Sequence, residues 1–494
     1  MLTLRRLAAL LLLLVVSLVV YSCARNPVTG KRQISLVSES QEIEMGKAYD
    51  PQVVAQYGIY EDPQLQQFIT EKGKAMAAVS HRPNLNYEFK IVDSPVVNAF
   101  AVPGGYVYFT RGIMAHFSSE AEFAGVLGHE IGHVTARHSA QQMTKQTLGQ
   151  IGMIGGMIAV PELAQQSQLL SQALGLAFLK FGRDDERQSD KLGVEYSTEI
   201  GYDAQQMAKF FGTLQAMRGE AGADMPNFTS THPNPGERKA KVLQMAKAAQ
   251  AAAPGQEFKV GRDSYLRMID GMVYGEDPKG GYEENGRFYH PVLKFQFPIP
   301  ANWRTANSPA QYQMGEPNGR AIMSLTLAQG NDLTAAAQNF VQQAQMNVLD
   351  NKAVRVNGLD ALAVLGEIDQ TPQGQQPSAN TRLRGLIYFI QYGGNIYQIT
   401  GLTRVNDYTR YAPAFQRTME GFAQLTDPSK LDRQPERIKI MTANRSATLQ
   451  QLLQQAGIPG DRMREMAVLN GMELNATLGA GTLYKSLTGG QLRS

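Results

Sequence analysis

The segment H-E-I-G-H at residues 129–133 constrains this chain more than any other, because its two histidines come together only on a helix. Ser119 and Glu122 form a capping-box pattern ahead of this segment, and apolar residues follow them at helical spacing. At about 100° per residue, His129 and His133 project about 40° apart on adjacent turns. Both imidazoles can therefore reach one metal ion, and we expect a helix that carries a metal site.

Acidic residues near and beyond this segment supply the rest of a catalytic site. A Zn²⁺ ion lowers the pKa of a bound water to about 7, and Glu130 is close enough to take the proton of that water. A catalytic zinc needs a third protein ligand, for which Glu186 is the candidate. Glu186 and Asp190 share one helix face, so one can bind metal while the other accepts a hydrogen bond from a ligand histidine. The alternative is that the charged run at residues 183–187 is solvated surface.

Four other histidines are expected to lie away from this ion. His138 is nine residues after His129, about 180° around a continuous helix, so it is not expected to share the metal. His81, His116 and His290 are isolated in the sequence. All four are therefore predicted to be structural or exposed.

Several motifs together resemble metallopeptidase family 48, the gluzincin group that includes the CAAX prenyl protease and the HtpX-like and BepA-like peptidases. They are H-E-I-G-H, R-x-x-E-x-x-x-D-x-x-G at residues 183–193, the segment 98–108 before the predicted helix, T-H-P-x-x-x-x-R at residues 231–238, and the lead-in at residues 26–30 and 41–43. The lead-in is similar to that of lipoprotein members. The resemblance covers about residues 24–255, and it departs from the family at Gln188-Ser189, where many relatives carry Glu-Ala.

This resemblance implies a mainly helical gluzincin protease domain with a small edge-strand sheet and one zinc ion per chain. Its implied zinc ligands are His129, His133 and Glu186, with Glu130 as general base and Asp190 supporting a ligand histidine. His232 would be a regulatory fourth ligand that holds the site shut, or else a helix cap or a surface His-Pro turn. Arg238 would stabilise the oxyanion of the tetrahedral intermediate.

A strand is predicted over residues 99–110 with an open edge. Such an edge would accept an extended peptide by β-addition and bring its scissile carbonyl to the zinc. The predicted substrate contacts are Asn98, Ala99 and Phe100. Gly104 and Gly105 permit close backbone approach, and they are equally compatible with a plain hairpin turn.

The first 22 residues predict a signal peptide, with Arg5 and Arg6 followed by an apolar run at residues 7–20. Residues 20–23 resemble a bacterial lipobox, so cleavage before Cys23 would leave a lipidated N-terminus that holds the protein on a membrane. The alternatives are ordinary cleavage near residue 22 with a free thiol, or an uncleaved anchor. Ala24 after the cysteine resembles the outer-membrane sorting default. We therefore expect an exported, lipid-anchored protein at the periplasmic face of the outer membrane.

Composition excludes other classes of protein. With 494 residues, of which 43% are hydrophobic and 18% charged, the chain is expected to fold into two to four domains. Without residues 1–22 it has 45 basic and 44 acidic residues, which does not favour nucleic-acid binding. No apolar run reaches the roughly 20 residues that a spanning helix needs. Its single cysteine excludes an intramolecular disulfide, and the predicted metal ligands do not require a thiol.

The sequence predicts an α+β multidomain protein. Its parts are a signal peptide (1–22), a zinc metallopeptidase domain (23–255), a connector (256–285), an α+β accessory domain (286–428), a linker (429–435) and a C-terminal module (436–494). In the accessory domain, alternation at 288–297, hairpin signals at 354–358 and 393–395, and helical patterns at 333–347 and 408–425 are similar to PsbP-like sheets packed by helices.

The C-terminal module is predicted to run strand, helix, helix, strand over residues 436–487, and it resembles LysM modules. Ser446-Ala447 stand where Gly-Asp is common. Weak peptidoglycan contact and a purely structural role therefore both stay open.

Three functions are compatible with these patterns. The first is a zinc endopeptidase of the bacterial cell envelope that cleaves misfolded or misassembled proteins with a metal-bound hydroxide and Glu130 as general base. The second is an autoinhibited or non-proteolytic periplasmic chaperone or assembly factor that binds clients with the same fold. The third is a peptidoglycan-associated anchoring protein. The intact H-E-I-G-H segment favours the first function over the third.

Overall fold

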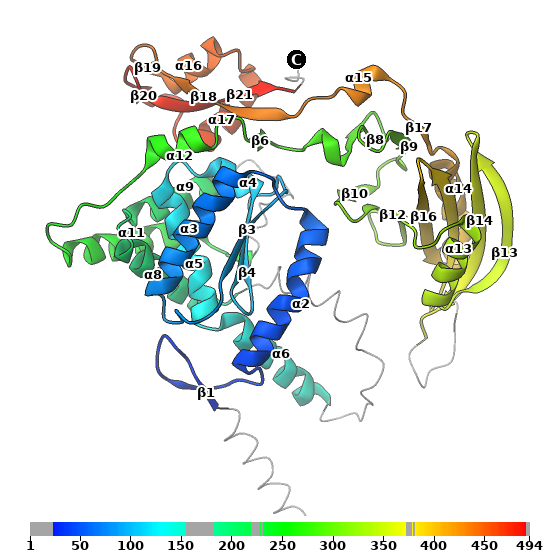
Figure 1. The fold of residues 1–494 in the computed structure, drawn as a ribbon, viewed down its shortest axis with the longest axis horizontal. Helices are drawn as coiled ribbons and strands as arrows, with labels where there is room; N and C mark the ends of the chain where they lie inside the picture. The colour runs from blue at the N-terminus through cyan, green and yellow to red at the C-terminus, as the bar shows by residue number, and fades with distance from the viewer. Residues whose placement is uncertain are drawn as a thin grey trace, which may run out of the picture. The chain divides into compact units, whose positions relative to one another are not determined.

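The computed structural model describes residues 23–154, 181–218, 228, 231–371, 378 and 381–490 (Figure 1). The chain divides into two compact units, a first unit of Met1–Gly275 with Glu436–Ser494 and a second unit of Glu276–Pro435. The predicted signal peptide lies outside the described residues. No helix in the described ranges has both the length and the apolar character needed to cross a membrane.

The first unit is mainly helical, and the described residues of its N-terminal part form a three-stranded sheet and the two-stranded hairpin of β1 (Cys23–Arg25) and β2 (Arg32–Ile34). Its helices there are α2 (Glu39–Tyr57), α3 (Pro63–Val79), α4 (Arg111–His116), α5 (Glu120–Thr135), α6 (His138–Ile154), α8 (Arg183–Glu199), α9 (Gln205–Arg218), α11 (Pro235–Ala251) and α12 (Arg262–Met268). Every residue of α5 is buried. Because α5 packs against α3, α8, α9 and the sheet, it is the central element of the unit.

Helix α5 begins where the sequence predicts. The Ser119 side chain accepts a hydrogen bond from the Glu122 backbone N–H at 3.1 Å, which caps the first turn. The Glu122 carboxylate accepts from the backbone N–H of Ser118 at 2.7 Å, so only half of the predicted capping box forms. The helix ends at Thr135, and Arg137 follows with a φ of 61° before α6 begins. A continuous helix through residue 138, on which the predicted direction of that histidine rested, is therefore wrong.

The small sheet has the strand order β3-β5-β4, with β3 (Glu88–Val92), β4 (Ala99–Val102) and β5 (Tyr106–Thr110). The single strand predicted over residues 99–110 is wrong, since β4 and β5 form an antiparallel hairpin. Gly104 and Gly105 make its turn at φ values of 88° and 97°, where a side chain would be strained. A Cβ on Gly104 would also lie 2.7 Å from the carbonyl oxygen of Glu42. β4 is left at the edge of the sheet.

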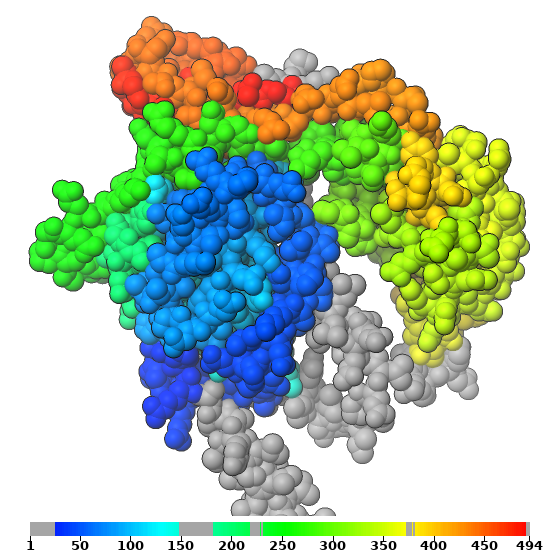
Figure 2. Space-filling view, in the orientation of Figure 1, coloured from blue at the N-terminus to red at the C-terminus, as the bar shows by residue number. Residues whose placement is uncertain are grey.

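The C-terminal module has the predicted order of strand, helix, helix and strand. These elements are β18 (Glu436–Thr442), α16 (Leu449–Gln455), α17 (Met463–Asn470) and β21 (Leu483–Gly489), with short strands β19 (Ala447–Thr448) and β20 (Thr477–Leu478). β18 pairs with β21 and with β6 (Val273–Tyr274), so the short strand β6 from the earlier part of the chain joins the sheet of the module. Figure 2 shows it against the α12 segment, where Arg262 donates to the carbonyl oxygen of Leu483 at 2.8 Å. The likeness to LysM modules and the peptidoglycan contact stay predictions.

The second unit contains two antiparallel sheets. Seven strands have the order β10-β11-β12-β16-β15-β14-β13. They are β10 (Arg304–Asn307), β11 (Tyr312–Gly315), β12 (Ala321–Leu327), β13 (Asn347–Val356), β14 (Leu359–Asp369), β15 (Arg382–Tyr392) and β16 (Asn395–Arg404). Four more have the order β17-β9-β8-β7, namely β17 (Ala423–Gln424), β9 (Phe295–Pro298), β8 (Arg287–His290) and β7 (Tyr282–Glu284). With the helical first unit, these sheets give the α+β multidomain architecture that the sequence predicts.

Helices cover both faces of the seven-stranded sheet, as the alternation along β15 requires. Ile387 and Phe389 join the apolar cluster of α13 (Leu333–Gln343), whereas Leu386, Tyr388 and Ile390 join that of α14 (Tyr408–Glu420). Both helices are shorter than predicted. The strand predicted over residues 288–297 is instead the pair β8 and β9, because Lys294 turns the chain with a φ of 57°.

Candidate metal centre

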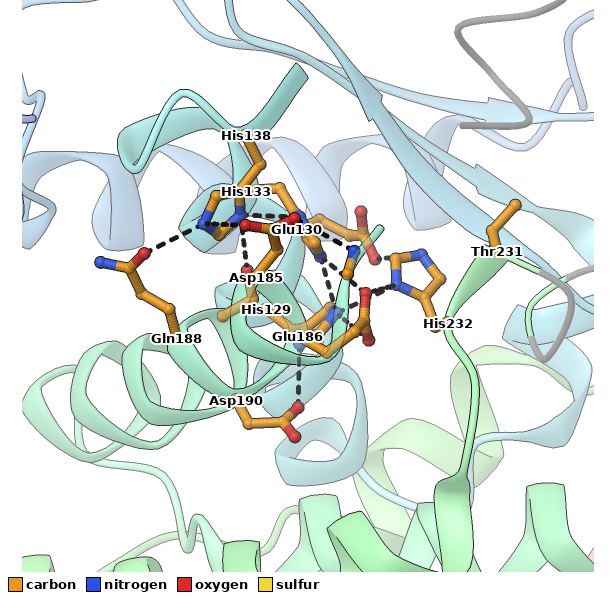
Figure 3. Close-up of polar contacts among 12 residues, drawn as sticks. His129, Glu130, His133, His138, Asp185, Glu186, Gln188, Asp190, Thr231 and His232 are labelled. Atoms are coloured by element: carbon orange, nitrogen blue, oxygen red, sulfur yellow. Dashed lines mark hydrogen bonds and ion pairs between the residues drawn. The ribbon is translucent and has the colours of Figure 1, made fainter. Parts of the chain in front are cut away.

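Four buried side chains bring their ligand atoms to one point of the first unit. His129 and His133 come from α5, Glu186 comes from α8, and His232 comes from the segment before α11 (Figure 3). One ligand atom of each lies within 4.8 Å of all the others. All four residues are at most 2% exposed. The structure thus brings together the three predicted ligands and the predicted fourth one.

The distances in this cluster fit a metal ion better than a set of ordinary hydrogen bonds. His133 Nε2 lies 3.0 Å from His129 Nε2, which lies 3.2 Å from His232 Nδ1. His232 Nδ1 is 2.9 Å from Glu186 Oε1. Because His129 Nδ1 lies 3.1 Å from Asp190 Oδ1, which can only accept, His129 Nε2 carries a lone pair toward the cluster. Three imidazole nitrogens and one carboxylate oxygen form a donor set that suits zinc.

Glycines explain why α5 and α8 approach closely enough to share this site. A Cβ on Gly128 would lie 3.0 Å from the Cα of Gly193, and one on Gly132 would lie 3.2 Å from the Cα of Ser189. A Cβ on Gly193 would in turn lie 3.0 Å from the carbonyl oxygen of Gly125. The bare backbones therefore pack against each other, and this contact brings the carboxylates of α8 to the histidines of α5. Gly125, Gly128 and Gly132 share one face of α5 at helical spacing, and Gly193 is the last residue of the motif at 183–193, but nothing in the sequence predicted that they meet.

Glu130 has the features of a general base. It is 1% exposed, and its Oε1 makes no hydrogen bond within the described part of the chain. Its charged neighbour is His232, whose Nε2 lies 3.6 Å from that oxygen. Burial raises the pKa of the Glu130 carboxyl to about 8 in the metal-free chain. The carboxyl group is therefore buried beside the ligand cluster without a donor that would keep it permanently ionised.

Arg238 contacts two carboxylates of α8, those of Asp190 and Glu186. Its Nε and Nη2 donate to the Asp190 carboxylate at 2.9 and 2.6 Å, and its Nη1 lies 2.7 Å from Glu186 Oε2. The guanidinium carbon lies 4.4 Å from the centroid of the Phe211 ring, which covers it. With these contacts, Arg238 orients Asp190, and Asp190 in turn orients His129.

The electrostatics at His129, His133 and Glu186 favour the protonation states that a metal requires, whereas the carboxylates of Glu186 and Glu130 outweigh burial and raise the pKa of His232. Burial lowers the pKa of His129 to about 4 and the pKa of His133 well below its usual value, so both imidazoles are neutral at pH 7. Burial alone would raise the pKa of Glu186, but the charges of His232 and Arg238 outweigh it and lower the pKa. Glu186 is therefore an ionised carboxylate, ready to bind a cation.

Two residues outside the predicted site contact it. His138 Nδ1 lies 3.0 Å from His133 Nδ1, and Gln188 Oε1 lies 3.0 Å from His138 Nε2 (Figure 3). His138 is 1% exposed, since the helix break at Arg137 turns it back toward α5. It offers no atom to the four-residue ligand cluster, as expected. Neither glycine nor proline marks this break, so the sequence held no signal for it.

The remaining predicted residues lie on elements beside the centre. Asn98, Ala99 and Phe100 are at most 4% exposed, and the Asn98 Oδ1 makes no hydrogen bond among the described residues. The edge strand β4 is thus covered in this structure. Cys23 begins the short strand β1 (Cys23–Arg25), which pairs with β2 (Arg32–Ile34).

Comparisons with known proteins point to peptidases. The model of the family described as "Peptidase family M48" matches residues 63–246. The chain is 30% identical over 378 residues to the "Beta-barrel assembly-enhancing protease" of Yersinia pestis, covering 72% of this chain and 75% of that protein. It is 31% identical over 195 residues to the "Mitochondrial metalloendopeptidase OMA1" of Arabidopsis thaliana, covering 39% of this chain and 38% of that protein. It is 28% identical over 229 residues to the "Beta-barrel assembly-enhancing protease" of Escherichia coli K12, covering 44% of this chain and 47% of that protein. The chain thus spans less than half of the last two relatives.

Among solved structures, the chain matches a solution structure of cyanobacterial PsbP (CyanoP) from Synechocystis. The match has 12% sequence identity and covers 30% of this chain and 99% of that one. Its TM-score is 0.23, which is too low to establish a shared fold.

Proposed function

The chain belongs to peptidase family M48, and from this membership we propose that it is a zinc-dependent endopeptidase of the bacterial cell envelope. One observation carries the proposal. The ligand atoms of His129, His133 and Glu186 converge at one buried point, and the buried carboxyl group of Glu130 follows His129 on the same helix. A structural metal site has no need of such a buried acid beside it, whereas peptide hydrolysis does.

The roles of the residues follow from their surroundings. Zinc, when bound, would supply a Lewis acid that polarises a water molecule and the peptide carbonyl. Glu130 would take the proton of the attacking water and pass it to the leaving amine, since its carboxyl group is buried beside the ligand cluster. Asp190 would hold His129 in the required tautomer. Arg238 makes two hydrogen bonds to Asp190 and an ion pair with Glu186, so we assign it to positioning in this state rather than to the oxyanion.

The proposed substrates are polypeptides, with misfolded or misassembled envelope proteins as the favoured class. Two relatives carry the name beta-barrel assembly-enhancing protease, which supports this choice. β4 is an edge strand, and a peptide could add to it through backbone hydrogen bonds near Asn98, Ala99 and Phe100. Because these residues are buried here, binding would require their cover to move.

A specific observation favours a gated form of the same function. His232 Nδ1 takes the fourth ligand position, and its ring stacks on Phe228 with centroids 4.6 Å apart. A fourth protein ligand leaves no open position for water, which an active zinc site needs. The second candidate is therefore an autoinhibited peptidase, or a chaperone or assembly factor that binds clients without cleaving them.

For location, we propose export and a lipid on Cys23 that anchors the chain at the periplasmic face of the outer membrane. The β1–β2 hairpin is tied to the catalytic helix, since the Asn26 side chain donates to the carbonyl oxygen of Ala136 at 3.2 Å. The hairpin region exposes three cations, Arg25, Lys31 and Arg32, beside Ile34 and Leu36, which are 48% and 43% exposed. A lipid on Cys23 would therefore hold the metal centre close to an anionic lipid surface.

Zinc content and casein cleavage test the proposal on the purified chain without its signal peptide. We expect about one zinc per chain, and we expect Glu130→Gln to abolish cleavage while keeping the zinc. Cleavage that survives Glu130→Gln would refute the mechanism, and a chain without zinc would refute the metal site. Inert wild type together with active His232→Ala would establish the gated form, whereas an inert His232→Ala variant that still binds clients would favour the chaperone.

A further inference from the structure

We propose that His138 and Gln188 are positioning residues, which hold His133 in the one tautomer and ring orientation that can bind zinc. This inference rests on the proposed zinc site and adds a second route by which the protein orients its ligands. Asp190 orients His129 from one side, whereas no carboxylate in the described part of the chain contacts the Nδ1 of His133. A neutral histidine occupies that place instead.

His133, His138 and Gln188 form a compact chain of contacts, called the relay below. His138 is the first residue of α6, and its ring lies 5.0 Å from the ring of His133 at an interplanar angle of 73°. The two Nδ1 atoms are 3.0 Å apart, and Gln188 Oε1 is 3.0 Å from the other ring nitrogen of His138 (Figure 3). The ring of Phe181 lies 4.1 Å from that of His133 and covers it on one side.

One assignment of protons satisfies every contact in the relay. The side-chain oxygen Oε1 of Gln188 can only accept a hydrogen bond, so His138 Nε2 donates to it. The Nδ1 of a neutral His138 then carries a lone pair, which accepts the proton on His133 Nδ1. His133 Nε2 is left with its lone pair free, and this atom lies 3.0 Å from His129 Nε2 and 3.5 Å from Glu186 Oε1, where the metal would sit.

Two other groups reach His138 and define the controls. Ser189 Oγ lies 3.3 Å from His138 Nδ1 and is the competing donor for that lone pair. Asp185 Oδ1 lies 3.8 Å from His138 Nε2 and is a second, more distant acceptor. If the relay acts as proposed, removing the Ser189 hydroxyl leaves the bond from His133 intact, whereas removing the Gln188 amide weakens the hold on His138.

The test is the zinc dissociation constant, measured by chelator competition on the full chain without its signal peptide. We expect His138→Phe, which keeps a ring but removes the acceptor, to weaken zinc binding by about 10- to 100-fold. Gln188→Leu should weaken it less, and Gln188→Glu should tighten it, because a carboxylate is a stronger acceptor. Ser189→Ala and the distant control His81→Phe should stay within about twofold of wild type. This order of effects, with opposite signs at residue 188, is not expected from a merely structural role.

A second readout is the tautomer itself. Nitrogen-15 NMR of histidine-labelled protein should show His133 protonated on Nδ1 and unprotonated on Nε2 in the zinc-free wild type, and a mixture of both tautomers in His138→Phe. Unchanged zinc affinity and an unchanged His133 tautomer in His138→Phe would overturn the inference. If His138→Phe does not fold, equal zinc affinity of Gln188→Leu and Gln188→Glu overturns it instead. Wild type without zinc affinity would refute the proposed function, which is a separate outcome.

Discussion

Helix α5 carries three buried glutamates, and two of them, Glu120 near its start and Glu130 near its other end, are ten residues apart and have opposite surroundings. Glu120, 4% exposed, accepts hydrogen bonds from Tyr202, Ser264 and Lys259 at 2.6, 2.5 and 2.9 Å. These donors outweigh burial and lower its pKa. Glu130, 1% exposed, has no donor on Oε1, and burial raises its pKa to about 8.

Burial of charge is therefore not what distinguishes the active end of this helix. At the first end, the carboxylate of Glu120 is matched by donors from three other elements, so the group joins parts of the fold. At the second end, Glu130 Oε1 makes no hydrogen bond among the described residues, and a cation or a transferable proton nearby would relieve this. The hydrogen-bond partners of the two carboxyl groups, rather than their burial, therefore separate Glu120 from Glu130.

The most direct test of this comparison replaces each of the two glutamates by glutamine. Glu130→Gln should lower peptidase activity by about 10³-fold, because it removes the proton acceptor. Glu120→Gln should leave kcat nearly unchanged but lower the free energy of unfolding by about 1–3 kcal/mol, since it breaks charge-assisted hydrogen bonds. Casein cleavage and urea unfolding of both variants measure this. Equal activity losses in the two variants would show that the ends do not differ as described.

Lys485 of the C-terminal module extends this comparison to a buried basic side chain. It is 1% exposed, and its amino group makes three hydrogen bonds. Its amino group donates to the carbonyl oxygens of Ala115 and Phe117, just before α5 begins, at 2.8 and 2.7 Å, and to that of Leu469 in α17 at 2.8 Å. Lys485→Met should cost about 3 kcal/mol of unfolding free energy, since it leaves buried carbonyls unpaired. Lys439→Met is the matched control, because that lysine is 50% exposed and should cost less than about 1 kcal/mol. Similar losses in both variants would mean that the module contributes little to the first unit.

The sequence could predict part of the buried histidine and carboxylate cluster because the spacing within each helix is local. His129 and His133 share a helix face by the 3.6-residue period, and Glu186 and Asp190 share another by the same rule. The register of one helix against the other could not be predicted, because it depends on glycine contacts between segments more than 50 residues apart. Sequence periodicity therefore predicted which side chains share a face, but not which faces meet.

The position of His138 could not be predicted for a similar reason. Arg137 adopts its positive φ with its side chain held by distant groups, namely the Glu42 carboxylate at 2.6 Å and the carbonyl oxygen of Val37 at 2.8 Å. The break that turns His138 toward the metal centre thus depends on residues about 100 positions earlier. In the second unit, the predicted alternation at residues 288–297 is split by a turn that Pro291 marks in the sequence and that ends at Lys294, where φ is 57°.

A smaller effect is expected from the cap at the first end of α5. Ser119→Ala removes the side-chain acceptor for the Glu122 backbone N–H and should cost about 1 kcal/mol of unfolding free energy. Zinc affinity should not change, because the ligands lie more than two turns further along the helix. Thermal unfolding and chelator competition on the same sample separate the two effects. A loss of zinc affinity in Ser119→Ala would show that the first end controls the second.

The pH dependence of stability gives the smallest effect. Because the pKa of Glu120 is lower in the folded chain than in the unfolded one, its stabilising contribution is fully present above the unfolded value of about 4.5. That contribution is lost as the pH falls below this value and through the folded pKa. The stability difference between wild type and Glu120→Gln should therefore be constant from pH 7 to about 5 and shrink below that, by less than about 1 kcal/mol for the first pH unit. Urea unfolding across this range measures it, with Ser119→Ala as the variant that should show no such trend. A difference that grows toward acid would mean that Glu120 is held in its neutral form, and the two ends of α5 would then be alike.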